Sequence, residues 1–376
     1  MTAAVTSSVP AYAEAVLSGG ILACKLVRLA AERHLRDLET CQARGLWFDE
    51  DAAQWACDFY SGLSHYKGEW AGQPIRLEPW QQFIIGSVFG WKRDDGTRRF
   101  RIAYIEVPRK KGKSLLSAGV GLILAFFDNE GGSEVYSAAT KREQAKIVWG
   151  DARTMVLISL YLKQRITALV GNLHSTATQS KFQPLGADVD GMDGLNIHGN
   201  IIDELHAHKT RAMWDVLQTA TGSRRQPLTF AITTAGFDRQ SVCWEQHDYG
   251  VKINERIIED DSFFSFVSTL DEGDDWALPE TWAKANPNYG VSVNIDDLRR
   301  KCERAKQIPG EQNAFLRLHL NCWTQQDIRW LDIDVWNGGD VLPPDDLEGR
   351  SCFAGVDLSS TGDITALELY FPDDEG

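Results

Sequence analysis

Short apolar runs alternate with longer amphipathic stretches through the middle of the chain. Four of these runs are β-prone: residues 100–107, 134–139, 197–202 and 228–233. Three of the stretches that follow them have a helical spacing of apolar positions: residues 114–127, 141–160 and 211–221. Strands that alternate with helices are typical of a parallel sheet covered on both faces. The pattern therefore predicts an α/β fold with a mainly parallel central sheet flanked by helices.

The two ends of the chain differ from the middle in their pattern of apolar residues and in composition. Residues 12–60 read as helical, whereas residues 237–330 are polar and rich in tryptophan, with a helix expected over 295–307. A boundary-like loop over 338–349 (GGDVLPPDDLEG) precedes two more strand candidates, CFAGVDL and ITALELY. We therefore divide the chain into a helical region (1–75), an α/β core (76–236), a small lid or linker subdomain (237–345) and the start of a further domain (346–376).

Composition places the chain among ordinary globular proteins, with 43% hydrophobic and 24% charged residues. The longest apolar stretch, 114–127, is too short to span a bilayer, and the first residues lack the pattern of a signal peptide. The seven cysteines are scattered singly with no CxxC pair. We therefore expect reduced thiols in a cytoplasm and no membrane partner.

The net charge of −14 first argues against a nucleic-acid partner, but the charge is unevenly distributed. Residues 331–376 carry twelve acidic residues and one arginine, which leaves the rest of the chain close to neutral. Residues 92–113 hold nine Lys or Arg against three acidic residues. Local basic stripes set the field that a phosphate backbone feels. The charge neither excludes DNA nor demonstrates it.

The sequence VPRKKGKS (107–114) has the tail of a phosphate-binding loop, G-x-x-x-x-G-K-[ST], with Val107 in place of the first glycine. Such a loop points backbone N–H groups and a helix start at the anion. Gly112 permits close backbone approach, Lys113 supplies a cation and Ser114 offers a hydroxyl to Mg²⁺. Pro108 helps to fix the turn. The alternative for this motif alone is a basic surface loop.

Two later motifs favour the nucleotide site. NIIDELH ends a β run with Asp203 and Glu204, which are suited to holding a water on Mg²⁺ and orienting the attacking water. FAITTAG places Thr233 and Thr234 at the end of the next strand, where hydroxyls are able to sense a γ-phosphate. An acidic pair also occurs by chance, and Thr-Ala-Gly is usually a turn or cap. The order and spacing of all three motifs favour the functional interpretation.

Upstream, LEPWQQF places Trp80 and Gln81 before the first strand of the core. An amide is able to read an adenine edge and an aromatic ring is able to stack on it. The alternative is a helix start with Pro79 in its first turn and Trp80 in the core.

Together these motifs, with WAKANPNYG and FAGVDLSSTGDITALELY, resemble the large terminase subunit of tailed double-stranded-DNA phages, from about residue 77 onward. The resemblance implies an N-terminal P-loop ATPase of the ASCE type, which pumps DNA into a procapsid, and a C-terminal RNase H-like nuclease, which cuts concatemers. It also implies ATP and Mg²⁺ as cofactors. The partners that it implies are double-stranded DNA, a portal protein and a small terminase subunit. A homo-oligomeric ring on the portal, with a monomer in solution as the alternative, and a location in the host cytoplasm are further expectations.

The same resemblance assigns roles to individual residues. Gln81, with Trp80 beside it, contacts adenine; Asp203 holds Mg²⁺ with Ser114; Glu204 orients the attacking water. The other residues of the phosphate site are Pro108, Arg109, Lys110, Lys111, Gly112 and Lys113, and residues 233–236 are the coupling motif. A ring motor also needs a cation from the neighbouring subunit. The candidates are Arg142, Arg224 and Arg225, each with a solvated surface arginine as the alternative.

The last part of the chain resembles the first hairpin of the nuclease. Asp357 matches its first metal-binding aspartate, and Asp363 is a second candidate ligand. Cleavage with two divalent metals needs several convergent carboxylates, and a single strand pair is too little for a domain. We therefore expect an incomplete nuclease, a poorly packed tail after about residue 347 and no nuclease activity.

The leading expectation is thus an ATP-driven DNA translocase. The alternatives are another ASCE nucleic-acid ATPase or helicase, whose further motifs we do not find, and a non-hydrolysing prophage remnant. The intact Lys113, Ser114, Asp203 and Glu204 argue against the remnant. Glu204 also argues against a small-molecule kinase, since it is suited to activating water. For the basic stripes at 92–101 and 299–306 we favour solvated faces over DNA contacts.

Overall fold

The computed structural model describes residues 9–140, 142–186, 194–324, 347, 349–358 and 365–372. The chain forms two compact units, Met1–Arg329 and Trp330–Gly376. Among the described residues, no helix is long and apolar enough to cross a membrane.

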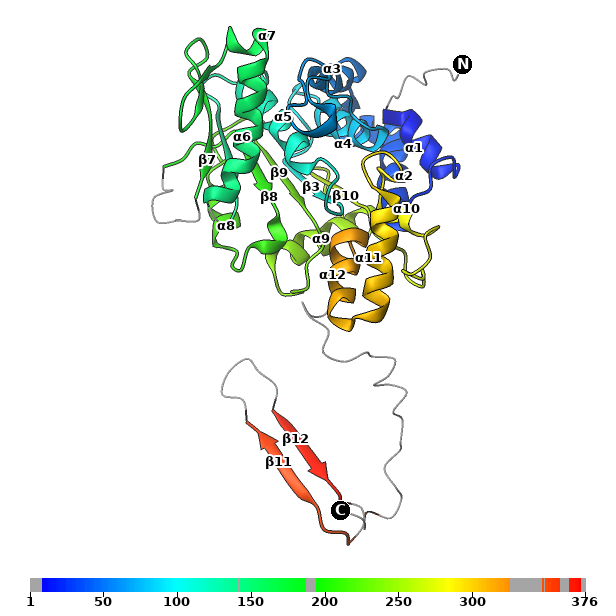
Figure 1. Cartoon of the computed structure of the whole chain (residues 1–376). Helices are drawn as coiled ribbons and strands as arrows, with labels where there is room; N and C mark the ends of the chain where they lie inside the picture. Colours follow the sequence, from blue (N-terminus) through cyan, green and yellow to red (C-terminus); the bar gives the residue numbers. More distant parts are fainter. Residues whose placement is uncertain are drawn as a thin grey trace. The chain divides into compact units, whose positions relative to one another are not determined.

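An eight-stranded sheet forms the centre of the first unit (Figure 1). Its order is β10-β3-β9-β8-β4-β7-β6-β5, and neighbouring strands from β10 to β7 are parallel, whereas β6 and β5 are antiparallel to their neighbours. The strands are β3 (Ile102–Glu106), β4 (Glu134–Ala138), β5 (Thr167–Ala168), β6 (Leu173–Ser175), β7 (Ser180–Leu185), β8 (Gly199–Asp203), β9 (Leu228–Thr233) and β10 (Phe263–Val267). The predicted mainly parallel α/β sheet is confirmed.

Helices cover both faces of this sheet because its strands are buried on both sides. Alternate residues of β3 point to opposite faces: Ala103 and Ile105 join one core cluster, and Tyr104 joins another. The first cluster is covered by α1 (Val9–Leu17), α2 (Lys25–Thr40), α3 (Glu50–Ser61), α4 (Pro79–Gly90), α5 (Lys113–Phe126) and α6 (Arg142–Ile158). The second is covered by α8 (Ala212–Thr219) and α9 (Val242–Asn254). Four short helical segments lie between these helices and strands: η1 (Cys41–Arg44), η2 (Gly68–Trp70), α7 (Leu160–Lys163) and η4 (Leu205–Ala207).

Six strands were not among those that the apolar pattern predicts: β1 (Leu46–Phe48), β2 (Trp91–Arg93), β5, β6, β7 and β10. β10 lies beside β3 at the sheet edge, so the sheet continues past residue 236, where we placed the start of the lid. β7 lies in a stretch that reads as loop-rich, because its alternating residues SKFQPL include a proline and polar side chains. A small antiparallel pair joins β1, in the predicted helical region, to β2, near the start of the predicted core.

The basic stripe at 92–101 is not the solvated face that we favoured. Arg99 is fully buried, 2.7 Å from Asp37 and 2.6 Å from Asp261, with its guanidinium over the ring of Trp91. Arg98 is also buried and pairs with Asp128 at 3.1 Å. These arginines are paired inside the protein, as buried charges must be. The stripe at 299–306 is different, since its basic side chains form exposed ion pairs.

Three helices follow β10 and share a small core of their own: α10 (Trp282–Ala285), α11 (Ile295–Gln307) and α12 (Pro309–Leu320). Trp282, Leu298 and Phe315 meet in this core. The predicted helix over 295–307 coincides with α11. We call α10–α12 the helical unit.

The second compact unit contains one described hairpin. β11 (Phe353–Asp357) pairs antiparallel with β12 (Ala366–Tyr370), which confirms the two strand candidates. The residues of both strands are exposed. Asp357 ends β11, whereas Asp363 lies outside the described residues.

Candidate functional site

The phosphate loop connects the carboxyl end of β3 to the first residue of α5. Two of its residues have left-handed backbone, Lys110 with φ 65° and Gly112 with φ 73°. Gly112 is also the N-cap of α5. A left-handed turn before a helix start turns backbone N–H groups toward one point, which makes an anion site. The missing first glycine does not matter locally, because Val107 is fully buried and donates its N–H to Thr233 O.

Lys113 lies at the centre of the site. Its Nζ donates a hydrogen bond to Thr234 Oγ1 and lies 3.5 Å from Glu204 Oε1. The side chain is only 6% exposed, and burial lowers the pKa of Lys113, whereas Glu204 and Asp203 act to raise it. The loop lysine is therefore held within reach of both later motifs.

Ser114 and Asp203 form a pair that fits a magnesium ion. Ser114 Oγ lies 3.4 Å from Asp203 Oδ2, and the other oxygen, Asp203 Oδ1, is buried without a hydrogen-bond partner. Burial, and then the charge of Glu204, raise the pKa of Asp203 to about 7. A cation bound between Ser114 and Asp203 would favour the ionised carboxylate and so offset the effects of burial and of Glu204 on its pKa. One carboxylate and one hydroxyl, completed by phosphate and water oxygens, is a usual Mg²⁺ site. Among the described residues, no group of three or more His, Cys, Asp or Glu is placed to hold a metal ion.

Glu204 follows β8 and has left-handed backbone, with φ 53°. Its Oε2 lies 3.2 Å from His206 Nδ1. Burial raises the pKa of Glu204, but His206 and Lys113 outweigh burial, so the pKa falls to about 2. The carboxyl group is therefore ionised at neutral pH, as a group that orients water needs to be.

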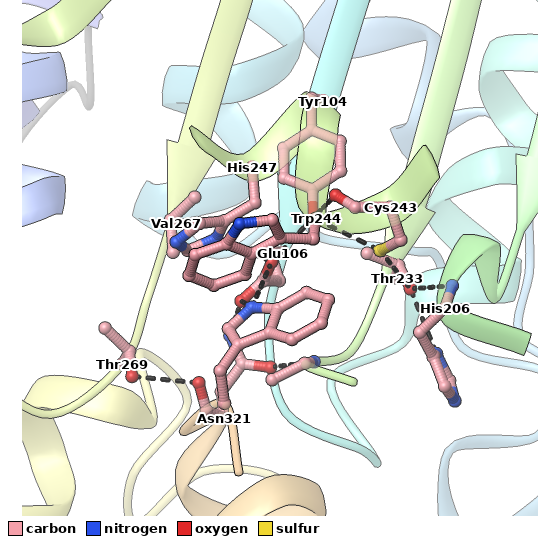
Figure 2. Close-up of polar contacts among 12 residues, drawn as sticks. Tyr104, Glu106, His206, Thr233, Cys243, Trp244, His247, Val267, Thr269 and Asn321 are labelled. Atoms are coloured by element: carbon pink, nitrogen blue, oxygen red, sulfur yellow. Dashed lines mark hydrogen bonds and ion pairs between the residues drawn. The ribbon is translucent and has the colours of Figure 1, made fainter. Parts of the chain in front are cut away.

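The coupling motif lies beside this pair. Thr233 Oγ1 accepts a hydrogen bond from His206 N at 3.1 Å and lies 3.0 Å from His206 Nδ1. Gly236 is packed so closely that an added Cβ would lie 2.9 Å from Cζ3 of Trp323. His206 thus contacts both Glu204 and the coupling motif (Figure 2 shows its contact with Thr233).

A cavity of about 480 Å³ opens over the phosphate loop. Besides the loop and Glu204, it is lined by residues from two distant segments: His65, Tyr66, Lys67 and Asp151. Tyr66 donates its hydroxyl hydrogen to Asp151 Oδ1, and Lys67 Nζ lies 3.2 Å from the same oxygen. This contact joins the segment after α3 to α6 at the mouth of the cavity.

Gln81 contacts the loop, and Trp80 precedes Gln81 on α4. Gln81 Oε1 accepts from Glu78 N at 2.9 Å in a capping box, and Gln81 Nε2 donates to Lys111 O at 3.4 Å. Both ends of the amide are engaged with backbone, so the contact with adenine stays a prediction. Trp80 is buried, stacked on Phe266, as in the alternative that places it in the core.

The basic residues of the loop do not all face the cavity. Arg109, Lys110 and Lys113 line it. Lys111 is instead turned into the interior, with 2% exposure, and burial lowers the pKa of Lys111 to about 7. The phosphate role suggested for Lys111 is thus not supported by its position.

The three candidate trans-acting arginines differ in their surroundings. Arg224 donates to Glu130 Oε1 at 2.9 Å, and also to backbone oxygens of Gly131, Gly132 and Asn196. Arg225 is exposed and lines a separate cavity of about 590 Å³. Arg142 begins α6, and its side chain lies outside the described residues.

Sequence reasoning missed His206, Tyr66 and Asp151. His206 had a usable signal, since it stands two residues after Glu204. Tyr66 and Asp151 are 85 positions apart, and no local pattern connects them.

Comparisons with known proteins agree with this geometry. Residues 79–252 match the sequence model of the ATPase domain of the terminase large subunit, and residues 257–376 match the model of its endonuclease domain. The second match starts well before residue 346, where we placed the nuclease.

Individual proteins give the same result. The chain is similar to the protein YmfN of Escherichia coli (strain K12), with 34% identity over 187 residues, 49% of this chain and 41% of that protein. It is 28% identical over 315 residues to the large terminase subunit of Enterobacteria phage HK97, covering 82% of this chain and 60% of that one. The crystal structure of the HK97 bacteriophage large terminase superposes with a TM-score of 0.63 at 26% identity, over 86% of this chain and 66% of that one.

The chain thus spans 41% and 60% of the lengths of these curated relatives. The two domain matches follow one another along the sequence, and the first contains the phosphate loop, the acidic pair and the coupling motif. The chain belongs to the terminase large subunit family.

Proposed function

We propose that the chain is the ATPase of a DNA-packaging motor, which hydrolyses ATP to ADP and phosphate and moves double-stranded DNA into a procapsid. One observation carries the proposal. Lys113, Glu204 and Thr234 meet at the carboxyl ends of the adjacent strands β3, β8 and β9. Ligands of open α/β sheets bind at this edge.

Each side chain of the site has a task in phosphoryl transfer. Lys113 and the backbone of the loop bind the phosphates, and Arg109 and Lys110 add positive charge from the cavity wall. Ser114 and Asp203 would hold Mg²⁺, which supplies charge neutralisation on the phosphate oxygens when it is bound. Glu204 orients the water that attacks the terminal phosphate. His206 holds Glu204 from the side that faces the coupling motif.

The motor needs partners that the chain itself does not contain. We infer that it works in the host cytoplasm as a ring on a portal protein, with a small terminase subunit and with DNA held through its phosphates. A neighbour's arginine completes each site. Arg142 and Arg225 are the candidates that remain, because the side chain of Arg224 is bound to Glu130 and to backbone oxygens within the chain. ATP binding closes the helical unit against the core, and hydrolysis resets it.

The 376-residue chain is proposed not to cut DNA. Asp357 ends a hairpin whose strand residues are exposed, whereas two-metal cleavage needs several convergent carboxylates. Metal-dependent nicking of plasmid DNA by the purified chain would overturn this part of the proposal.

DNA-stimulated ATP turnover tests the proposal against its alternatives. We expect phosphate release by the purified chain to rise with long linear duplex DNA, and the stimulation to weaken steeply with salt. Turnover that requires a free single strand would favour a helicase. Lack of turnover with DNA and portal both present would favour a non-hydrolysing remnant.

A further inference from the structure

The last turn of α12 contacts both loops of the nucleotide site. Leu318 O accepts a hydrogen bond from the backbone N–H of Arg109, in the phosphate loop, at 3.0 Å. Three residues later, Asn321 Oδ1 accepts from the backbone N–H of Ala235, in the coupling motif, at 2.7 Å. One helix end is therefore attached to the two segments that a bound nucleotide touches.

Asn321 makes a second set of contacts with the other side of the same amide. Its Nδ2 donates to Ser268 O, just after β10, at 2.9 Å and to Glu106 Oε1 at 3.2 Å. Its backbone oxygen accepts from Thr269 Oγ1 at 2.8 Å (Figure 2). The residue is fully buried. Its amide therefore connects the coupling motif, the end of β10 and the end of β3.

Glu106 anchors this arrangement because it is the last residue of β3, directly before the phosphate loop, and is fully buried. Its Oε2 accepts from Tyr104 Oη at 2.6 Å and lies 2.9 Å from His247 Nδ1. Trp323 Nε1 lies 3.2 Å from both carboxyl oxygens. Figure 2 shows Tyr104 and His247 beside the carboxyl group of Glu106. A buried carboxyl group with this many donors is held in one place.

The contacts of Asn321 lead directly to the phosphate-binding lysine. Lys113 Nζ donates to Thr234 Oγ1, and the next residue, Ala235, donates to Asn321. A nucleotide phosphate that takes Lys113 as its partner competes with Thr234 for the same ammonium group. Since the helical unit has its own core, a shift of Asn321 moves that unit as a body.

We propose that Asn321 is a positioning residue that transmits nucleotide occupancy from Thr234 and Ala235 to the helical unit. This inference rests on the proposed nucleotide site. It adds which residue carries the signal and which helices receive it.

The variant Asn321→Gly tests the role of the amide with little effect on the backbone. Asn321 has φ 57° and ends α12 in left-handed conformation, where glycine is the preferred residue. Asn286→Ala is the matched control, because Asn286 is also buried and donates Nδ2 to His319 O and Trp282 O within the helical unit. Thermal unfolding of both variants verifies that they fold.

The readout is hydrogen exchange of peptides from α11 and α12, with and without a slowly hydrolysed ATP analogue, ATPγS, and Mg²⁺. We expect the nucleotide to change exchange in these helices in the wild type and in Asn286→Ala. In Asn321→Gly, we expect ATPγS still to bind and to protect the phosphate loop, while the change in α11 and α12 is lost.

Each outcome has one meaning. If the wild type does not bind ATPγS, the proposed nucleotide site is wrong. If ATPγS protects the phosphate loop of the wild type but leaves α11 and α12 unchanged, transmission through Asn321 is wrong, whatever the variants do. A full response in Asn321→Gly, or its loss in Asn286→Ala as well, also overturns the specific role of Asn321.

Discussion

Lys113 Nζ lies 3.5 Å from Glu204 Oε1, so the cation of the phosphate loop and the carboxylate after β8 stabilise each other's charged forms. The two residues are 91 positions apart in the sequence and follow β3 and β8, which are separated in the sheet by β9. β9 itself ends at the coupling motif. The residues that we assign to phosphate binding, water activation and coupling are thus in contact with one another.

Ser114→Ala should weaken nucleotide binding in Mg²⁺ by roughly tenfold and have little effect in EDTA, because only the metal contact is lost. Ser117→Ala is the control, since Ser117 is buried on the same helix and its Oγ has no hydrogen-bond partner. Titration with a fluorescent ATP analogue measures both. Equal losses with and without Mg²⁺ would contradict the assignment of Ser114 to the metal.

Lys111→Met should stabilise the protein near pH 7 by an amount on the order of 2 kcal/mol, because the buried lysine is hard to keep charged. Burial lowers the pKa of Lys111 from 10.5 to about 7. Between these values the unfolded chain holds the proton that the folded chain has lost, so this lysine makes wild-type stability rise with pH. The advantage of the variant should therefore be complete below pH 7 and shrink toward pH 10.5.

Urea unfolding of both proteins at several pH values measures that difference. Buried cysteines and tyrosines titrate in both proteins, so their effects cancel when the two curves are subtracted. An advantage that grows with pH would show that Lys111 is not the buried cation described above. Nucleotide affinity should stay close to that of the wild type, since Lys111 points away from the cavity.

Arg224→Ala should destabilise the fold by about 3 kcal/mol, because it leaves Glu130 and three backbone oxygens without their buried cation. Arg225→Ala should leave the unfolding temperature nearly unchanged, since Arg225 is exposed. Differential scanning calorimetry distinguishes the two. Similar unfolding temperatures for the two variants would mean that Arg224 is not needed for stability. It would then again be a candidate for the trans-acting arginine.

His206→Gln should lower kcat by roughly tenfold and leave the KM for ATP near its wild-type value, because His206 holds Glu204 and does not line the phosphate cavity. His208→Gln is the control: it is a buried histidine two residues away whose pKa burial lowers to about 4. Steady-state phosphate release measures both variants. A matching loss in His208→Gln would indicate a general effect on the loop after β8.

The sequence was sufficient to predict those elements whose signal lies within a short stretch of neighbouring residues. β9 spans the predicted residues, and the phosphate loop lies between a strand and a helix as its motif requires. β10 was missed because FFSFV, buried on all sides, stands in a polar stretch that resembles a linker. The burial of Arg98 and Arg99 was missed because their partners Asp128, Asp37 and Asp261 are distant in the sequence.

Some residues of the candidate site could likewise be predicted from the sequence, whereas others could not. Lys113, Ser114, Asp203 and Glu204 belong to motifs that are readable without a structure. Asn321 is not, because its importance comes from contacts with Glu106, Ala235 and Ser268, which only the packing of α12 against the sheet brings together. Glu106 offered a weak signal, as a charged residue at the end of an otherwise apolar strand.

The most direct test of the central claim is ATP hydrolysis by Glu204→Gln beside the wild type, with nucleotide binding measured on the same samples. Glutamine keeps the size of the side chain and removes the charge that orients water. We predict that the variant binds ATP with Mg²⁺ as the wild type does and that its turnover falls by at least about 100-fold. Unchanged turnover in Glu204→Gln would contradict the assignment of this site as the ATPase centre of the chain.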